Sequence, residues 1–174
     1  MERRRSRDFW LSEESRSHIA PTGEAHEGFD IGLCLRLLCG PEVCEIGCGY
    51  GRLAPYFEHY VGLDVSGPRI DACRDRYPGV QFHRIEYDDD YPLAACYLFC
   101  GVLLHVPDAE LQLIVERTRG SRVVIAEVMN PAYADNHITF HRDPEGYGRF
   151  GQPTVYEMPY ARYQDTYTFL RFDP

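Results

Sequence analysis

The fold of this chain is decided by one short stretch, Val43-Cys44-Glu45-Ile46-Gly47-Cys48-Gly49-Tyr50-Gly51-Arg52. The stretch predicts a short buried strand that ends in a glycine-rich turn, followed by a helix that starts near Leu53 and tolerates Pro55 in its first turn. Glycines at alternate positions let the backbone turn sharply and let a ligand approach the main chain closely. The backbone N–H groups of such a turn, next to a helix N-terminus, suit an anionic group.

Two acids accompany the glycine turn. Glu45 lies two positions before the first glycine, and Asp64 ends the apolar run Tyr60–Leu63. An acid at the end of a second strand is placed to accept both ribose hydroxyls of a nucleoside. A dinucleotide-binding fingerprint has the spacing G-x-G-x-x-G, whereas the order here is G-x-G-x-G, with Arg52 where the late glycine would be. The spacing therefore argues against a dinucleotide-binding Rossmann domain.

These residues resemble the class I S-adenosylmethionine-dependent methyltransferases, whose pattern is a strand, E-x-G-x-G-x-G, a helix and a second strand that ends in an acid. The resemblance spans about residues 29–172. It implies an α/β fold, a Rossmann-like three-layer sandwich with a mostly parallel seven-stranded sheet of order 3-2-1-4-5-7-6 and a C-terminal antiparallel hairpin. It also implies S-adenosyl-L-methionine as the cofactor. The residues that it places around the cofactor are Glu45, Gly47, Cys48, Gly49, Gly51, Asp64, Val65, Glu86, Tyr87 and Cys100.

Some of these assignments have alternatives. Glu45 is expected to bond the amino-acid part of the cofactor, directly or through water, or else to be satisfied by N–H groups of the turn, because a buried carboxylate needs partners. Glu86 and Tyr87 follow the expected third strand, where the family places an acidic residue and the adenine contact. The acid can accept from the adenine amino group and the aromatic ring can cover the ring face. The alternative is a solvated acidic loop.

The run Gly101–Asp108 resembles the family's G-V-L-x-H-V-P-D segment after the fourth strand. The resemblance places Cys100 and His105 beside the sulfonium. His105 can act as a general base, because the unperturbed pKa of histidine is close to working pH. It can equally hold its loop by hydrogen bonding to the backbone. The acid that usually opens the fourth strand is missing, and Ala94-Ala95-Cys96 stand there.

The rest of the chain alternates helices and strands, which predicts right-handed crossovers and a parallel sheet. Leu33 and Leu37 are expected in the buried stripe of a helix over 29–39. Asp108 is expected to cap a helix that begins at Ala109. A run of apolar residues, Ala94–Val102, predicts a strand buried on both faces. The further elements predicted are a helix after Ser66, strands over 80–85 and 122–128, a short helix over 144–150, and a hairpin of 154–163 with 166–172.

The segment before the hairpin carries polar residues but no recognisable site. Asn130-Pro131-Ala132-Tyr133 is similar to the [D/N]-P-P-[Y/F] tetrapeptide of amino-methylating nucleic-acid enzymes, but it follows the fifth strand rather than the fourth. We interpret it as a turn. His137, His141 and Arg142 lie where the family has substrate loops. No tight histidine or cysteine spacing indicates a metal, so no metal site is expected.

Composition restricts the partners and the compartment. The formal net charge of −9 makes nucleic acid an unlikely partner. No run of eighteen apolar residues occurs, so no membrane span is expected, and the basic N-terminus lacks the apolar region of a secretory signal. The seven cysteines lie mostly in apolar segments, which favours reduced core thiols and a cytoplasmic protein.

The sequence therefore predicts an enzyme that transfers a methyl group from S-adenosylmethionine to an O or N atom of a small-molecule acceptor. Residues 1–28 are expected to form a segment that covers the site, and residues 29–174 a single class I methyltransferase domain. The alternative is a non-catalytic S-adenosylmethionine-binding module or a subunit that acts only with a partner. Methylation of RNA or protein stays open, because a fold does not set the acceptor. The oligomeric state is not predicted.

Overall fold

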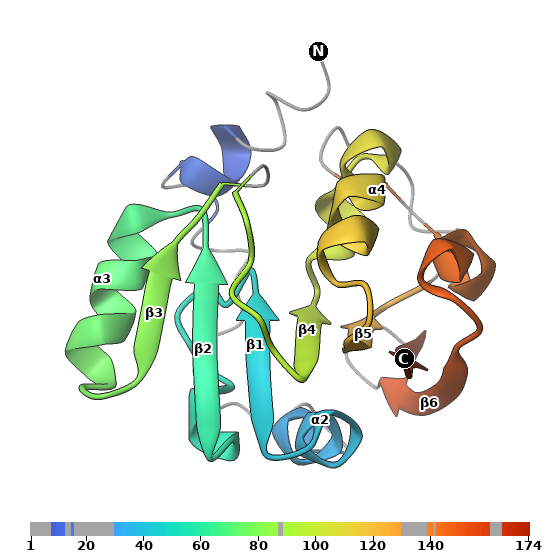
Figure 1. Cartoon of the computed structure of the whole chain (residues 1–174), viewed down its shortest axis with the longest axis horizontal. Coiled ribbons are helices and arrows are strands. Elements are labelled where there is room, and N and C mark those ends of the chain that lie inside the picture. Colours follow the sequence, from blue (N-terminus) through green and yellow to red (C-terminus); the bar gives the residue numbers. More distant parts are fainter. Residues whose placement is uncertain are drawn as a thin grey trace.

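The computed structural model describes residues 8–12, 15, 30–86, 89–129, 139–140, 142–160 and 165–174. Within these residues the chain forms one seven-stranded sheet of order β3-β2-β1-β4-β5-β7-β6, with helices packed against it (Figure 1). The elements, in chain order, are α2 (Ile31–Cys39), β1 (Glu42–Ile46), η2 (Ala54–Tyr56), β2 (His59–Asp64), α3 (Gly67–Arg76), β3 (Gln81–Arg84), β4 (Cys96–Cys100), η3 (Leu103–His105), α4 (Asp108–Arg117), β5 (Arg122–Glu127), η4 (Pro144–Phe150), β6 (Thr154–Tyr160) and β7 (Asp165–Phe172).

The sheet is parallel from β3 to β5 and antiparallel at its last two strands. β1 lies between β2 and β4, and both pairings are parallel. β7 pairs antiparallel with β5 and with β6. The predicted strand order and the C-terminal hairpin are therefore confirmed. Pro159 lies in β6, an edge strand, where its missing N–H leaves no ladder bond unmade.

The sheet is covered on both faces, which gives the predicted three layers. One hydrophobic cluster joins Leu35 of α2 and Ile70 of α3 to Leu98 of β4. A second cluster joins Leu111 of α4 and residues of η4 to Phe99, also of β4. Because neighbouring residues of a strand point to opposite faces, the fully buried Leu98 and Phe99 show that β4 is covered on both sides.

The helix α2 buries a different stripe from the one that we predicted. Its buried residues include Ile31, Leu35 and Cys39, spaced four apart along one face. Leu33 is 53% exposed and Leu37 is 74% exposed, so their assignment to the core is wrong. The helix is amphipathic, with Arg36 marking its polar side, and the leucine spacing considered without Arg36 misled the prediction.

The helix predicted after the glycine turn is reduced to the single 3₁₀ turn η2. Few residues separate Gly51 from the start of β2, and Pro55 removes one backbone N–H inside that short connection. Phe57 is already extended. A connection this short offers no N-terminal helix dipole to an anion, so that part of the sequence interpretation is wrong.

Two further findings concern the helices. Asp108 is the first residue of α4 rather than its cap; Pro107 occupies the N-cap, and the Asp108 carboxylate instead accepts hydrogen bonds from Arg142. Among the helices in the described ranges, none combines the length and the apolar character that crossing a membrane requires.

Candidate functional site

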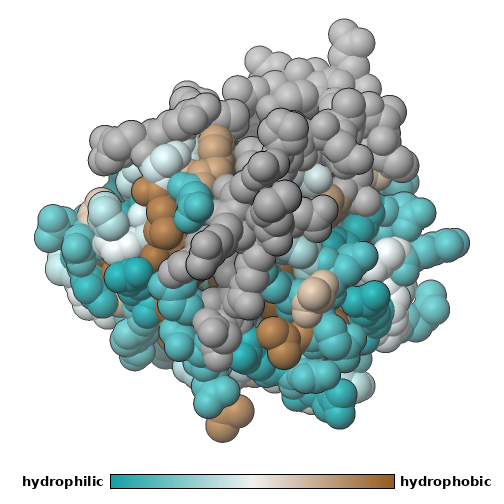
Figure 2. All heavy atoms as spheres, turned by 90° about the horizontal axis from the view of Figure 1, so that it is seen from above, coloured by the Kyte–Doolittle hydropathy of each residue, from teal (hydrophilic) through white to brown (hydrophobic). Residues whose placement is uncertain are grey.

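The carboxyl ends of β1, β2 and β4 meet at one edge of the sheet. In the register, Ile46 of β1 lies beside Leu63 of β2 and Phe99 of β4. The residues that follow these three positions are the glycine turn, Asp64 and Cys100, so the topology alone brings them together. Figure 2 views the molecule from above this edge, and the coloured residues around it are mostly hydrophilic.

The glycine turn adopts a backbone that other residues rarely adopt. Gly47, Gly49 and Gly51 have φ values of 74°, 57° and 69°. A Cβ at Gly47 would lie 2.5 Å from a methyl group of Val102, which follows β4. A Cβ at Gly51 would lie 3.0 Å from the ring of Phe82. The turn therefore needs glycine for its conformation and for the close approach of its neighbours.

The N–H groups of the turn already have partners within the protein. Those of Gly47 and Cys48 both donate to the carbonyl of Leu63, at 2.7 Å and 3.0 Å. The Gly51 N–H donates to the carbonyl of Cys48 at 2.9 Å. The Gly49 N–H donates to Asp64 Oδ2 at 2.9 Å. These amides are not available to a phosphate group, contrary to our expectation of an anion-binding turn.

Asp64 ends β2 and lies against the turn. Its Oδ1 accepts from the N–H of Ser66 at 2.9 Å and lies 3.8 Å from Nη1 of Arg69. Burial raises the pKa of Asp64, while these bonds and the one from Gly49 oppose the rise. The backbone N–H groups of Ser66, Gly49 and Val65 and the charge of Arg69 all act on this carboxylate, so a diol would share it with these partners or displace one of them.

Glu45 is buried in β1 beside Tyr60 of β2. The hydroxyl of Tyr60 donates to Oε2 of Glu45. Burial raises the pKa of Glu45 to about 7, although the bond from Tyr60 and the charge of Arg52 lower it. The partner is therefore a tyrosine, and not the turn N–H groups that the sequence suggested as the alternative to a cofactor contact.

Cys100 ends β4 and belongs to a polar chain that crosses the site. Nη2 of Arg52 donates to its Sγ at 3.3 Å, and the hydroxyl of Tyr167 lies 3.5 Å from the same sulfur. Tyr167 also donates to the carbonyl of Ala126 at 2.9 Å. Burial raises the pKa of the Cys100 thiol, while the Arg52 charge lowers it. Arg52 thus reaches from the glycine turn to the end of β4.

The N-terminal segment packs over this edge of the sheet. The guanidinium of Arg69 on α3 donates to the hydroxyl of Ser15 and lies 6.0 Å from the ring centre of Trp10. Residues 8–11 form a helical turn that lies above the strands in Figure 1. The indole N–H of Trp10 is buried and has no hydrogen-bond partner among the described residues.

His105 lies in η3, next to this segment. Its ring centre is 4.5 Å from that of Trp10, with the planes at 61°, an edge-on packing. The backbone N–H of His105 donates to the carbonyl of Val102 at 2.9 Å. The ring of His105 is therefore in contact with the N-terminal segment.

Solved structures of low sequence identity share this fold. Magnesium protoporphyrin IX methyltransferase from Synechocystis PCC 6803 with bound SAH superposes with a TM-score of 0.72 at 13% identity, covering 97% of this chain and 98% of that one. The DhpI–SAH complex gives 0.62 at 18%, covering 99% and 94%. An S-adenosylmethionine-dependent methyltransferase from Mesorhizobium loti gives 0.57 at 15%, covering 77% and 91%. The chain has the class I methyltransferase fold. No protein-family model matches the sequence, and no curated protein does.

In this methyltransferase fold, the edge of β3 carries the expected adenine-binding residues. Nη2 of Arg84 lies 3.1 Å from Oε1 of Glu86, and its Nε donates to the carbonyl of Val65 at 3.2 Å. Tyr87 lies outside the described residues, as do the tetrapeptide 130–133 and two histidines of the substrate-loop assignment, His137 and His141. Among the described His, Cys, Asp and Glu side chains, no group of three or more is placed to hold a metal ion.

Several polar residues at this edge of the sheet were not predicted from the sequence. Tyr60 and Tyr167 read only as members of β-strands, although each donates to a polar partner at this edge. Arg52 was noted only as a departure from the glycine spacing. Arg142, assigned to a substrate loop, is instead buried against η3. None of these contacts has a local sequence signal, because each joins distant parts of the chain.

Proposed function

We propose that this chain binds S-adenosyl-L-methionine at the carboxyl edge of β1, β2 and β4 and transfers its methyl group to an oxygen or nitrogen atom of a small molecule. The observation that carries the proposal is the contact between Asp64 and the glycine turn, through the Gly49 N–H. The contact holds a carboxylate at the end of β2 next to a turn of glycines with positive φ, where the main chain can be approached closely. A ribose diol is the group that this arrangement suits.

The hydrogen bonds of the turn favour a cofactor without phosphate at this position. The amides of Gly47, Cys48, Gly49 and Gly51 all donate within the protein, so these four donors are not available to a pyrophosphate. S-adenosylmethionine joins a nucleoside to an amino acid without a phosphate. The residues that we assign to it are Asp64 for the ribose, Val65, Glu86 and Tyr87 for the adenine, Glu45 for the amino group, the turn residues Gly47, Cys48, Gly49 and Gly51, and Cys100 near the sulfonium.

The acceptor class rests on the similar structures and on charge. They include a magnesium protoporphyrin IX methyltransferase and one described by the conversion of a disulfide bond into a thioacetal group during echinomycin biosynthesis. The net charge of −9 disfavours nucleic acid. Methyl transfer is an in-line displacement at the methyl carbon, which depends mainly on positioning. A base is needed only for a hydroxyl or a protonated amine, and His105 is our candidate.

We assign residues 1–28 the role of a cover over the site of the domain formed by residues 29–174. The described residues of this segment contact Arg69, which also lies near Asp64, and His105. The buried indole N–H of Trp10 is a donor that a bound molecule can use. Closing such a cover would exclude water from the methyl group.

Calorimetry on the whole chain tests cofactor binding. S-adenosylmethionine and SAH should bind one to one, whereas ATP and NAD should not bind. Asp64→Ala should weaken binding by at least about tenfold, because it removes charged hydrogen bonds. The matched control is Asp71→Ala on α3, whose side chain is 74% exposed, and its affinity should equal the wild type. Failure of the wild type to bind either molecule would overturn the proposal.

A non-catalytic S-adenosylmethionine-binding module is the second candidate. The observation in its favour is the packing of Trp10 on His105, which covers the candidate base. Formation of SAH from S-adenosylmethionine in the presence of small hydroxyl, carboxyl and amine compounds, RNA or protein discriminates the two. Turnover with one class supports the enzyme and names its acceptor. Tight binding without turnover in every class supports the module.

A further inference from the structure

A buried polar network holds the backbone on both sides of His105. Glu127, the last residue of β5, is 1% exposed. Its Oε2 accepts from the N–H of Leu104 at 3.2 Å, and its Oε1 accepts from the hydroxyl of Tyr147 in η4. Burial raises the pKa of Glu127 to about 7, while the bonds from Tyr147 and the backbone and the charge of Arg142 lower it.

Arg142 holds the same turn from its carbonyl side. Nη1 donates to the carbonyl of Leu103 at 2.8 Å, and Nη2 donates to the carbonyl of Val106 at 2.6 Å. Nε and Nη2 bond Oδ1 of Asp108 at 3.1 Å and 2.8 Å, and Nη1 also reaches the carbonyl of Phe140 at 3.4 Å. The side chain of Arg142 is only 7% exposed. Each of the five N–H groups of its guanidinium nevertheless has an acceptor within the protein.

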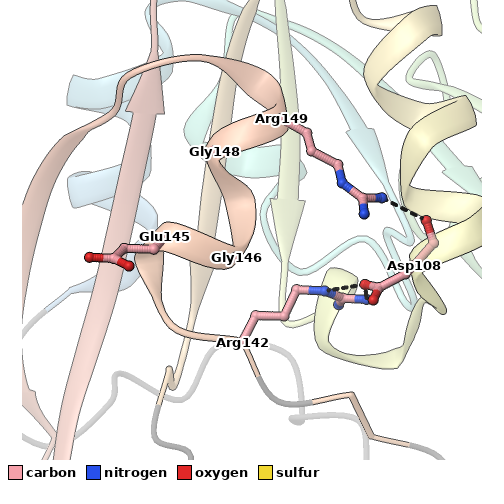
Figure 3. A pocket seen from close by; sticks show the side chains of 6 residues that line it. All are labelled: Asp108, Arg142, Glu145, Gly146, Gly148 and Arg149. Atoms are coloured by element: carbon pink, nitrogen blue, oxygen red, sulfur yellow. Dashed lines mark hydrogen bonds and ion pairs between the residues drawn. The ribbon is translucent and has the colours of Figure 1, made fainter.

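The surroundings of Arg142 indicate that this contact is a clamp and not an anion site. Figure 3 shows the guanidinium directed at Asp108, in an open hollow of about 520 Å³. Arg149 lies across the hollow and donates to the backbone carbonyl of Asp108 at 3.1 Å. Glu145 also lines the hollow, so two carboxylates accompany the two guanidinium groups. The guanidinium of Arg142 is therefore fully occupied by Asp108 and by backbone carbonyls.

Leu103 and Val106 are fully buried and anchor η3 by apolar packing, but burying two charged side chains beside them is costly. A fully satisfied polar network offsets that cost by fixing one geometry of the backbone. We propose that Glu127 and Arg142 are positioning residues, which fix the η3 turn so that the ring of His105 meets Trp10. The importance of His105 in this proposal rests on the proposed function.

The experiment uses Trp10, the only tryptophan in the chain, as a reporter of the contact. Arg142→Met and Glu127→Leu should change the emission of Trp10 and speed amide hydrogen exchange in residues 103–106 by about tenfold or more, as expected when a clamp is lost. Dissociation of SAH should become faster by a similar factor. Arg149→Met is the matched control, because Arg149 lines the same hollow but donates to the backbone carbonyl of Asp108 and not to η3. It should match the wild type in all three measurements.

Two milder variants keep the test decisive if the first pair unfold. Glu127→Gln keeps an acceptor for the Leu104 N–H and a polar partner for Tyr147, so it should restore wild-type behaviour. Asp108→Ala removes an exposed carboxylate and leaves Arg142 half-anchored, so it should give a smaller change in the same direction. Unchanged Trp10 emission and exchange in Arg142→Met and Asp108→Ala would overturn the proposal. If wild type fails to bind SAH, the proposed function fails, but the emission and exchange comparisons still decide the clamp.

Discussion

Tyr60 donates a hydrogen bond to Glu45, and the pair joins two neighbouring strands of the sheet beneath the glycine turn. Both side chains are buried, and burial also raises the pKa of Tyr60 well above its usual value. The pKa of about 7 means that Glu45 is partly protonated at neutral pH. A bound cofactor with a positive amino group nearby would favour the ionised form.

This pair predicts a pH dependence of stability. The folded state binds the Glu45 proton more tightly than the unfolded chain, whose value is near 4.5. The contribution of Glu45 to the free energy of unfolding is therefore largest below about pH 4.5 and decreases as pH rises to about 7, by on the order of 3 kcal/mol. Glu45→Gln, which still accepts from Tyr60, should remove that decrease.

Urea unfolding at pH 5 and pH 8 measures the effect. Glu127 has a similarly raised pKa, so the wild type and Glu45→Gln should both lose stability at the higher pH, the variant by less. Glu127→Gln is the matched comparison, and it should remove the part of the pH dependence of stability that Glu127 contributes. A Glu45→Gln variant with the same pH dependence as the wild type would contradict the prediction.

A second prediction separates backbone strain from crowding at the glycine turn. Gly47→Ala should lose stability through its positive φ, about 1–2 kcal/mol, and through the clash with Val102, about a further 1–3 kcal/mol. Gly120→Ala is the control, because Gly120 also has a positive φ, 81°, but has nothing within 4 Å of an added Cβ. Gly120→Ala should lose only the stability that the positive φ costs, and nothing from crowding.

The double variant Gly47→Ala with Val102→Ala completes the cycle. Removing the valine methyl groups should recover the crowding part but not the strain part. Urea unfolding gives the stabilities, and calorimetry with SAH shows whether the turn keeps its shape. Equal losses in Gly47→Ala and Gly120→Ala would show that the approach of Val102 does not matter.

The sequence predicted the fold because its signals are local. The turn after β1, the acid after β2 and the doubly buried β4 each occupy a few consecutive residues, and the parallel order then brings Asp64 and Cys100 to one edge. The roles of these residues toward a cofactor stay predictions. The hydrogen bonds that satisfy the turn were not predicted, since the Leu63 carbonyl gives no sign of accepting two of them.

The parts that failed depend on contacts between distant residues. Arg142 was assigned to a substrate loop because position relative to the family was the only guide; its acceptors are carbonyls some forty positions earlier. The hydrogen bond from the Tyr60 hydroxyl was not predicted either, because Tyr60 stands in an apolar run and its acceptor, Glu45, lies on another strand. In α2, Leu33 and Leu37 have the same spacing of four as the core residues Ile31 and Leu35, and that spacing alone does not separate the two faces.

The corrected face of α2 gives a third prediction. Leu35→Ala should destabilise the chain by about 2–5 kcal/mol, because Leu35 is fully buried. Leu37→Ala, two residues further along the helix and 74% exposed, should change stability by less than about 0.5 kcal/mol. Chemical denaturation of the two variants decides the matter, and similar losses would place both leucines in the core after all.

The last prediction concerns what His105 contributes, and two substitutions separate its ring from its proton. His105→Phe keeps an aromatic ring against Trp10 but cannot transfer a proton, whereas His105→Asn keeps a polar group and loses the ring. The edge-on contact at 4.5 Å leads us to expect that the ring matters. His105→Phe should keep the SAH affinity and Trp10 emission of the wild type, whereas His105→Asn should lose affinity severalfold and shift the emission. Turnover with the identified acceptor is the second measurement, and it should persist in His105→Phe. A His105→Phe variant that folds and binds normally but is slower by on the order of 10²–10⁴ would instead identify His105 as the general base.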